Sequence, residues 1–247
     1  MLENILHCKD ISFHNMRLVE AGEKIRSLST GDKLNHVVTP NIDHLCKIYG
    51  SENNKQALPT IKAAALSLCN SRILEKMLRM KGKKLKEVVP GSTLTAYLFD
   101  KVLTPSDRIL IFGVENEHFE ILKQRYPHLT IDHINPSMGF IKKPDEVNDL
   151  IKQVEALDPS YIFLSVGAFQ QEIFANKLAQ TSKVKAVGLC VGASVLFLTG
   201  AQKRAPVFVQ KMHLEWALRM LTNPRRLVSI YFKNFLALPK IYKALQI

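Results

Sequence analysis

Polar side chains follow two β-rich runs of this sequence at positions where they could hold a ligand. The first run, residues 35–38, ends at Thr39-Pro-Asn41, and a later run ends in a glycine just before Gln171 and Glu172. In an open α/β sheet, side chains at the carboxyl ends of parallel strands face the crevice that binds ligands. Amide and carboxylate groups at a helix start also suit sugar hydroxyls, and the helix N-terminus itself suits an anion. Each strand end is therefore a candidate ligand site.

Both patterns also have structural interpretations that need no ligand. Asn41 is a good N-cap for the helix predicted after it. The negative charge of Glu172 in a first helical turn suits the helix dipole without any function. Sequence spacing leaves these alternatives open.

The carboxyl-terminal end of the chain is strongly basic. Residues 201–247 hold nine Lys or Arg and one acid, Glu215, so they carry a formal charge of +8 out of +12 for the whole chain. Such a field attracts phosphates, acidic lipid headgroups or nucleic acid. Leucines, phenylalanines and Trp216 lie between the basic residues, which favours a surface that packs on a lipid interface while binding phosphate. A solvated basic tail is the alternative interpretation.

A second basic cluster, between Lys76 and Lys86, is interpreted as a solvated helix face and loop. Outside the C-terminal stretch there is no aromatic and basic stacking platform and no recognition motif, so we expect no nucleic-acid partner.

Composition limits the class of protein. A chain of 247 residues with 47% hydrophobic residues can bury a full core. Its four cysteines lack a C-x-x-C spacing, so we expect buried thiols, no metal site and no cofactor. The N-terminus has no secretory pattern, and the longest weakly polar stretch, residues 186–200, is shorter than the ~20 residues of a membrane span. We therefore expect a cytoplasmic protein that touches a membrane only from its surface.

Strands and helices alternate along most of the chain. Helices are predicted over 19–28, 42–50, 91–100, 116–126, 144–156 and 170–180, and strands over 35–38, 109–113, 129–134, 161–167 and 185–191. This order predicts a doubly wound, mainly parallel α/β sheet of the Rossmann-like class. Residues 57–70 suit either a helix or a buried strand, and propensity favours the helix. The glycine motifs of dinucleotide enzymes and P-loop ATPases are absent, as is G-x-S-x-G.

Five short motifs, in order, resemble the WecG/TagA/CpsF family of glycosyltransferases. They are Val-Val-Thr39-Pro40-Asn41, Phe112-Gly113 before Tyr126-Pro127, Gly167-Ala-x-x-Gln171-Glu172, Lys203-Arg204-Ala205-Pro206, and Leu214-Glu215-Trp216-x-x-Arg219 with Pro224-x-Arg226. The resemblance implies an α/β core over residues 1–203, including a strand near 61–69, and a membrane- and diphosphate-binding appendage over 204–247.

The resemblance also implies an activity. Family members transfer a sugar, often of the N-acetylmannosamine type, from a UDP-sugar to a polyprenyl-diphosphate-linked acceptor, with inversion and without an essential metal. They work at the inner face of the cell membrane in cell-surface polysaccharide assembly. The implied sugar-pocket residues are Thr39, Asn41 and Gln171. Phosphate binding is expected of Arg204, Arg219 and Arg226, whose guanidinium groups suit a diphosphate.

This chain departs from the family pattern at polar positions. Where the family has a catalytic Asp after its second strand, this chain has Asn70, which can hydrogen-bond an acceptor hydroxyl but cannot take its proton near neutral pH. An expected Arg is Val88, an expected acid is Leu196, and a late Arg is Ile230. Two interpretations follow. In the first, the chain is an active transferase whose base is supplied elsewhere, with Asp43 and Glu172 as candidates. In the second, it is a catalytically impaired member that acts as a binding or regulatory subunit.

Overall fold

The structure is a computed structural model that describes residues 5–8, 10–50, 57–202, 236–243 and 245. In this part of the chain, six strands form one parallel sheet in the order β4-β3-β8-β7-β5-β6. The strands are β3 (Asn35–Val38), β4 (Leu66–Ser67), β5 (Arg108–Phe112), β6 (Thr130–Ile134), β7 (Tyr161–Leu164) and β8 (Val187–Cys190). A separate antiparallel hairpin joins β1 (Ile5–His7) to β2 (Ser12–His14).

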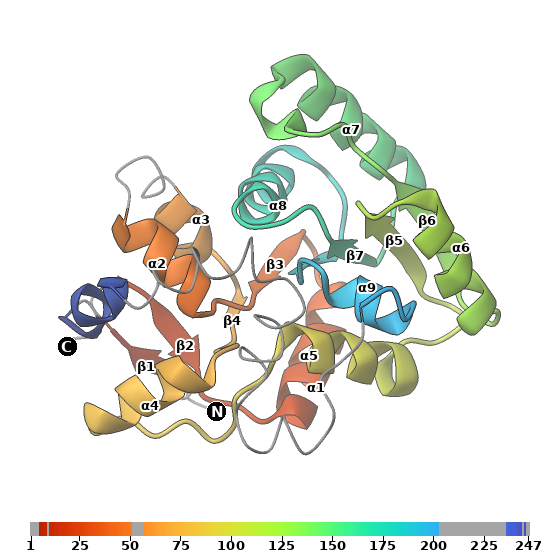
Figure 1. Cartoon of the computed structure of the whole chain (residues 1–247). Helices are drawn as coiled ribbons and strands as arrows, with labels where there is room; N and C mark the ends of the chain where they lie inside the picture. Colours follow the sequence, from red (N-terminus) through yellow and green to blue (C-terminus); the bar gives the residue numbers. More distant parts are fainter. Residues whose placement is uncertain (1–4, 9, 51–56, 203–235, 244, 246–247) are drawn as a thin grey trace.

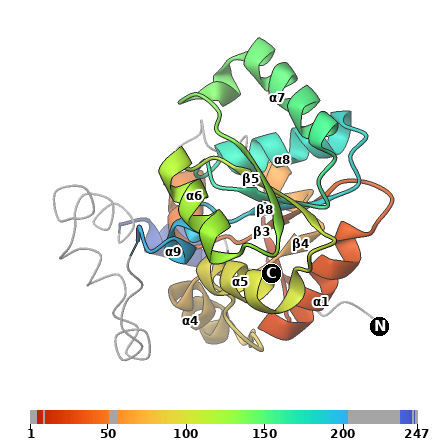
Figure 2. The same ribbon diagram turned by 90° about the vertical axis from the view of Figure 1, so that its right-hand side faces the viewer.

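Helices cover both faces of the sheet, as Figure 2 shows for α8 on one side and α5 and α1 on the other. One face packs on α1 (Leu18–Ser29), α5 (Gly91–Tyr97), the π-helical turn η2 (Leu98–Val102), α6 (Asn116–Arg125) and α9 (Ser194–Leu198). The apolar cluster on the other face includes α2 (Ile42–Gly50), α3 (Leu58–Lys62), α4 (Arg72–Met80), the 3-10 turn η3 (Phe140–Lys142), α7 (Pro144–Leu157) and α8 (Gln170–Thr181).

Alternation along each strand divides the core into these two layers. Val37 and Ile109 face the first layer, whereas their neighbours Val38 and Leu110 face the second. Because both faces are covered, the strands are apolar on both sides, which explains their near-continuous hydrophobic runs. The doubly wound parallel fold predicted from the sequence is confirmed.

The predicted helices and strands from α1 through β8 are present, with shifted ends. The strand predicted over 161–167 stops at Leu164, and residues 57–70 divide into α3 and the short strand β4. The helical interpretation of 57–70 was therefore only half right. Leu66 and Ser67 pair with Val37 and Val38 of β3, and this pairing outweighs local propensity.

The carboxyl-terminal residues described, 236–243, are helical and return to the body of the protein. Ile241 and Leu245 are buried in the same apolar cluster as α2 and α4 (Figure 1, dark blue). The predicted domain boundary near residue 203 and the motif at 203–206 lie outside the described residues.

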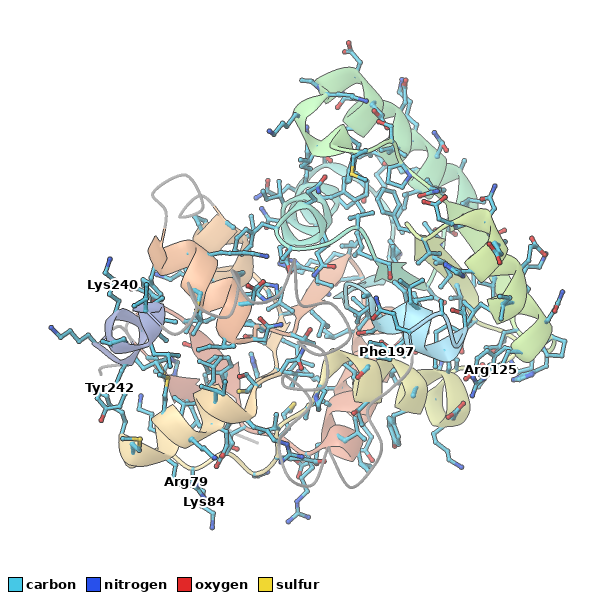
Figure 3. All side chains as sticks on the ribbon, in the orientation of Figure 1. Arg79, Lys84, Arg125, Phe197, Lys240 and Tyr242 are labelled. Carbon is cyan, nitrogen blue, oxygen red and sulfur yellow. The ribbon has the colours of Figure 1, made fainter. Side chains whose placement is uncertain are left out.

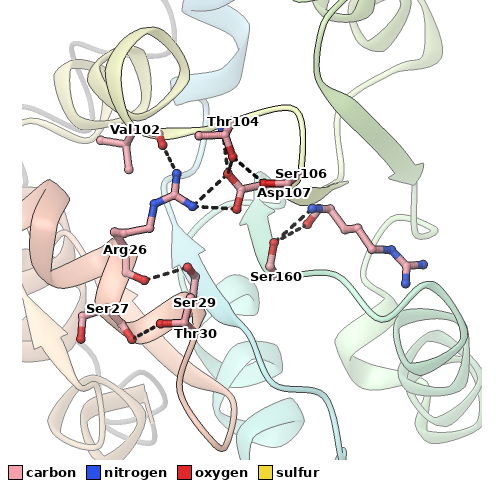
Figure 4. A network of polar contacts seen from close by, with 10 residues as sticks. Arg26, Ser27, Ser29, Thr30, Val102, Thr104, Ser106, Asp107 and Ser160 are labelled. Carbon is pink, nitrogen blue, oxygen red and sulfur yellow. Dashed lines mark hydrogen bonds and ion pairs between the residues drawn. The ribbon is translucent and has the colours of Figure 1, made fainter.

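A partly buried ion pair ties α1 to the start of β5 on the far side from the candidate ligand site. One guanidinium nitrogen of Arg26 donates to both carboxylate oxygens of Asp107, at 2.7 and 2.9 Å, and another donates to the Val102 carbonyl (Figure 4). Thr104 also donates to Asp107 from its backbone and its hydroxyl. Burial raises the pKa of Asp107, but these hydrogen bonds outweigh burial and hold the pKa below its usual range.

Replacing Arg26 leaves the Asp107 carboxylate buried without its cation. We expect Arg26→Met to lower the free energy of unfolding by about 1–3 kcal/mol at pH 7, discounted for the partial exposure of Arg26. Because the folded pKa of Asp107 is depressed, this stabilisation is present above about pH 4 and is lost as the pH falls through the folded value. Urea unfolding at pH 7 and below pH 4 measures both effects.

The matched control is Arg108→Met. Arg108 lies 3.8 Å from Asp158, and both side chains are largely exposed, so this change should have little effect at either pH. A difference between Arg26→Met and wild type that persists unchanged in acid would contradict the assigned role of Asp107.

Candidate active site

The carboxyl ends of β3, β8 and β7 are adjacent in the middle of the sheet. The chain leaves β3 for α2 and β7 for α8 on one face, whereas it leaves β8 for α9 on the opposite face (Figure 1). Neighbouring strands whose connections diverge in this way mark the topological switch point, where open α/β folds bind ligands. The two strand ends singled out from the sequence, β3 and β7, flank this point.

Gln171 bridges two of these connections. Its Oε1 accepts a hydrogen bond of 2.9 Å from the backbone N–H of Gly192, just after β8, and its Nε2 donates to Glu172 Oε1 at 2.8 Å. The Gly192 N–H can only donate, so the orientation of the amide is determined. Ser165, after β7, donates to the Gly192 carbonyl at 2.6 Å. The loop after β8 is thus held at both the N–H and the carbonyl of Gly192.

Asn41 caps α2, as the structural alternative supposed. Its Oδ1 accepts a hydrogen bond of 3.1 Å from the backbone N–H of His44, the third residue of the helix. The same oxygen lies 2.9 Å from His44 Nδ1. Asn41 therefore positions the His44 ring as well as starting the helix, and its own side chain stays half-buried at the sheet edge.

His44 and Glu172 join α2 to α8 beneath this edge. His44 Nε2 lies 3.4 Å from Glu172 Oε1, and the His44 ring packs edge-on against Phe169. Both ring nitrogens thus have polar neighbours: the backbone N–H and Oδ1 of Asn41 lie at Nδ1, and Glu172 lies at Nε2. Glu172 is only 1% exposed, and within the described part of the chain its Oε2 has no hydrogen-bond partner.

His44 was not predicted as a site residue. The sequence signal was its position three residues after Asn41, which places both side chains on one side of the first helical turn.

Gly91 of α5 packs closely against Thr39, at the end of β3, and against the residues that follow β8. Thr39 Oγ1 donates to the carbonyl of Cys190 at 3.3 Å, which links β3 to β8. A Cβ atom at Gly91, the first residue of α5, would lie 2.9 Å from Ser194 Oγ and 3.3 Å from Thr39 Oγ1. Only glycine fits here without moving the neighbouring hydroxyls.

Asn70 lies beside Thr39. Its backbone N–H donates to the Pro40 carbonyl at 3.0 Å, and its side-chain Nδ2 is 3.5 Å from the Thr39 carbonyl. The next residue, Ser71, caps α4 by accepting from the backbone N–H of Leu74. Asn70 is half-buried, so an amide occupies the edge of the site next to the end of β3.

The four cysteines are buried free thiols, as predicted. Burial raises the pKa of Cys46 and that of Cys69 to about 12, and it raises the pKa of Cys190 well above its usual value. Protonated thiols of this kind are poor nucleophiles near neutral pH. Cys190 therefore contributes packing and its backbone carbonyl to the site.

Two further features of the described residues bear on ligands. They contain no group of three or more His, Cys, Asp or Glu side chains placed to hold a metal ion. A hollow of about 550 Å³ lies between the end of β6 and α7, lined in part by His133, Asn135 and Glu146. Its lining includes none of the polar side chains that converge at the switch point.

Comparison with known proteins identifies the family. The profile described as "Glycosyl transferase WecG/TagA/CpsF family" matches residues 6–246. The chain belongs to this family of glycosyltransferases.

Two relatives of this family member share one name, N-acetylglucosaminyldiphosphoundecaprenol N-acetyl-beta-D-mannosaminyltransferase. The protein of that name from Bacillus spizizenii is 32% identical over 167 residues, which are 66% of this chain and 61% of the relative. The match thus spans less than two thirds of the Bacillus protein. One from Staphylococcus aureus is 27% identical over 226 residues, covering 88% of this chain and 84% of the relative. The family and the glycosyltransferase class predicted from the motifs are confirmed.

The predicted site residues divide into two groups. The first group lies at neighbouring strand ends: Thr39, Asn41, Asn70, Gln171 and Glu172. The predicted phosphate-binding residues and one departure from the family pattern lie outside the described residues: Arg204, Arg219, Arg226 and Ile230. The other two departures, at positions 88 and 196, are half-buried aliphatic residues.

A methyl group at Gly91 tests how tightly α5 fits the site. We expect Gly91→Ala to destabilise the protein by about 1–2 kcal/mol, because the buried Ser194 and Thr39 hydroxyls must both shift. Gly50→Ala is the control, since Gly50 also lies in a helix but nothing is within 4 Å of its added Cβ. Thermal unfolding of both variants gives the comparison, and equal midpoints would contradict the tight fit.

Proposed function

We propose that this family member transfers a sugar of the N-acetylmannosamine type from a UDP-sugar to a polyprenyl-diphosphate-linked acceptor, with inversion. The reaction takes place at the inner face of the cell membrane, in the assembly of cell-surface polysaccharide. The family match over residues 6–246 carries this proposal. The names of the two relatives support it, because both specify a diphosphoundecaprenol-linked acceptor and an N-acetylmannosaminyl group.

The arrangement of the strand ends supports the binding of a sugar at the switch point. Asn41 and Asn70 are half-buried there and can hydrogen-bond hydroxyl groups. Gln171 is buried, and its side-chain oxygen accepts a hydrogen bond from the Gly192 N–H. In this proposal Gln171 holds the shape of the pocket and offers its remaining Nε2 hydrogen. Arg204, Arg219 and Arg226 neutralise the charge that grows on the UDP leaving group.

The acceptor hydroxyl must lose a proton, and Asn70 cannot take it. Of the two carboxylates near the site in sequence, Glu172 is 1% exposed and contacts His44 and Gln171. Asp43 is half-buried in the first turn of α2, and its Oδ2 lies 2.7 Å from Lys47 Nζ. We therefore propose Asp43 as the general base and Glu172 as the residue that positions His44 and Gln171.

The amide at position 70 also favours a second candidate function. Without the family carboxylate, the chain could bind the nucleotide sugar or the lipid diphosphate without turnover, as a binding or regulatory subunit.

A transfer assay separates these functions. Purified protein is given a panel of UDP-sugars and a polyprenyl-diphosphate-linked sugar acceptor in detergent. We expect product from the wild type, much less from Gln171→Ala, and a faster reaction from Asn70→Asp, since general-base help is worth ~10²–10⁴-fold. UDP binding without product in wild type and Asn70→Asp would favour the non-catalytic subunit. Rates unaffected by Gln171→Ala would contradict the site assignment.

The role of Asp43 has its own test. Asp43→Asn should reduce the turnover rate by about 10²-fold or more, with little change in UDP affinity. Lys47→Met is the matched control, because it removes the ion-pair partner and leaves the carboxylate in place. A pH–rate profile of both variants provides the readout. If Lys47→Met reduces the rate as much as Asp43→Asn does, the ion pair matters for structure and Asp43 is not the base.

A further inference from the structure

The exposed side of α4 combines basic and large apolar side chains. Leu74 and Leu78 face the core, whereas Arg72, Lys76 and Arg79 point outward at spacings of four and three residues. Residues 72–86 hold seven basic residues and one acid, a formal charge of +6. From the sequence we interpreted part of this cluster as an ordinary solvated face, an interpretation that the exposed apolar residues now change.

Large apolar side chains are exposed on α4 and on the neighbouring helical residues 236–243. Met80 is 73% exposed, Leu236 60% and Ile73 40%. Ile73 and Met80 are seven residues apart, so they lie on the same side of the helix as the outward basic residues. Burial of a nonpolar side chain is favourable, so exposed apolar side chains beside an excess of positive charge indicate a contact surface.

The helical residues 236–243 extend this surface. Ile241 is buried against the cluster that contains Leu74, and Lys81 Nζ lies 4.1 Å above the Tyr242 ring, so the tail and α4 are adjacent. Lys240 and Lys243 are exposed on the tail. Figure 3 shows Arg79, Lys84, Lys240 and Tyr242 at this corner, with Lys84 and Lys240 reaching away from the body.

We propose that this corner, the α4 surface, is where the protein docks on an anionic lipid bilayer. It consists of Arg72, Ile73, Lys76, Arg79, Met80, Lys84, Leu236, Lys240 and Lys243. The basic residues bind acidic headgroups, and the three apolar side chains enter the boundary between headgroups and acyl chains. A nucleic acid would match the charge but would leave Ile73, Met80 and Leu236 exposed, because single-strand binding relies on aromatic stacking.

The position of α4 connects this surface to the proposed reaction, and in that respect the inference rests on the proposed function. Asn70, at the edge of the site, is followed by the cap residue Ser71 and then by α4. A helix of nine residues is about 13 Å long, so the docked surface begins beside the site and lies along the membrane from there. A lipid-linked diphosphate in the same headgroup layer would be close to the site.

Vesicle flotation tests the surface in the full-length protein. The vesicles are phosphatidylcholine with or without about a third phosphatidylglycerol, a proportion chosen to give a strongly negative surface. We expect binding only to the anionic vesicles and its loss when salt is raised to about 0.5 M. Lys76→Glu/Arg79→Glu should weaken binding at least ~10-fold, since each basic residue near an acidic surface contributes about fivefold.

Matched variants elsewhere exclude a general charge effect. Lys123→Glu/Lys152→Glu makes the same change of net charge on α6 and α7, and it should alter binding by less than about twofold. Met80→Asp should weaken binding, whereas Met138→Asp, at a residue 94% exposed near α7, should not. Equal losses in the α4 variants and their controls, or no loss in the α4 variants, would overturn the proposal. So would RNA binding that Lys76→Glu/Arg79→Glu abolishes while vesicle binding persists.

Activity measurements separate this surface from the transferase itself. With a short-chain, water-soluble acceptor the α4 variants should keep the wild-type rate, whereas with acceptor in vesicles their rate should fall in parallel with binding. A similar loss with the soluble acceptor would overturn the surface assignment. If the wild type transfers nothing but its vesicle binding depends on α4, the proposed function fails and the docking surface stands.

Discussion

The amide of Gln171 makes the contacts on which the geometry of the strand ends depends. It joins the start of α8 to the loop after β8 through Gly192, and it orients Glu172, which in turn lies against His44 on α2. Three connections that leave the sheet on two faces are thereby tied together at one point. Because these side chains are buried, each needs its partners, and the loss of one leaves others unsatisfied.

In this arrangement, buried side chains support the site, and half-buried side chains are the ones a ligand can contact. Glu172 and His44 lie beneath the strand ends, while Asn41 and Asn70 remain half-buried at the edge. The parallel sheet provides that edge because all its strands end on the same side, and the diverging connections leave their ends uncovered by a shared helix. An amide at position 70 fits this arrangement, because its backbone N–H donates to the Pro40 carbonyl and its side chain lies beside the Thr39 carbonyl.

Two regions of the chain are strongly basic. One is the basic C-terminal stretch that includes Arg204 and Arg219. The other is α4, whose helical spacing puts its basic residues outward and two leucines inward. Because α4 begins next to the site edge, a surface that meets acidic lipid there also sets the direction from which a lipid-linked acceptor would arrive. The orientation of the protein on the membrane would then also determine how a lipid-linked acceptor reaches the site.

Periodicity and motif order in the sequence determined the fold class, most helices and strands, and the family. These depend on local patterns: continuous apolar runs for strands covered on both faces, and glycine, proline and cap residues at their ends. The sequence did not determine that His44 meets Glu172 or that Gly91 must lack a side chain, and local propensity did not reveal the strand at residues 66–67, which only the family resemblance implied. Each of these depends on a partner far away in the chain, and only the tertiary structure brings those partners within contact distance.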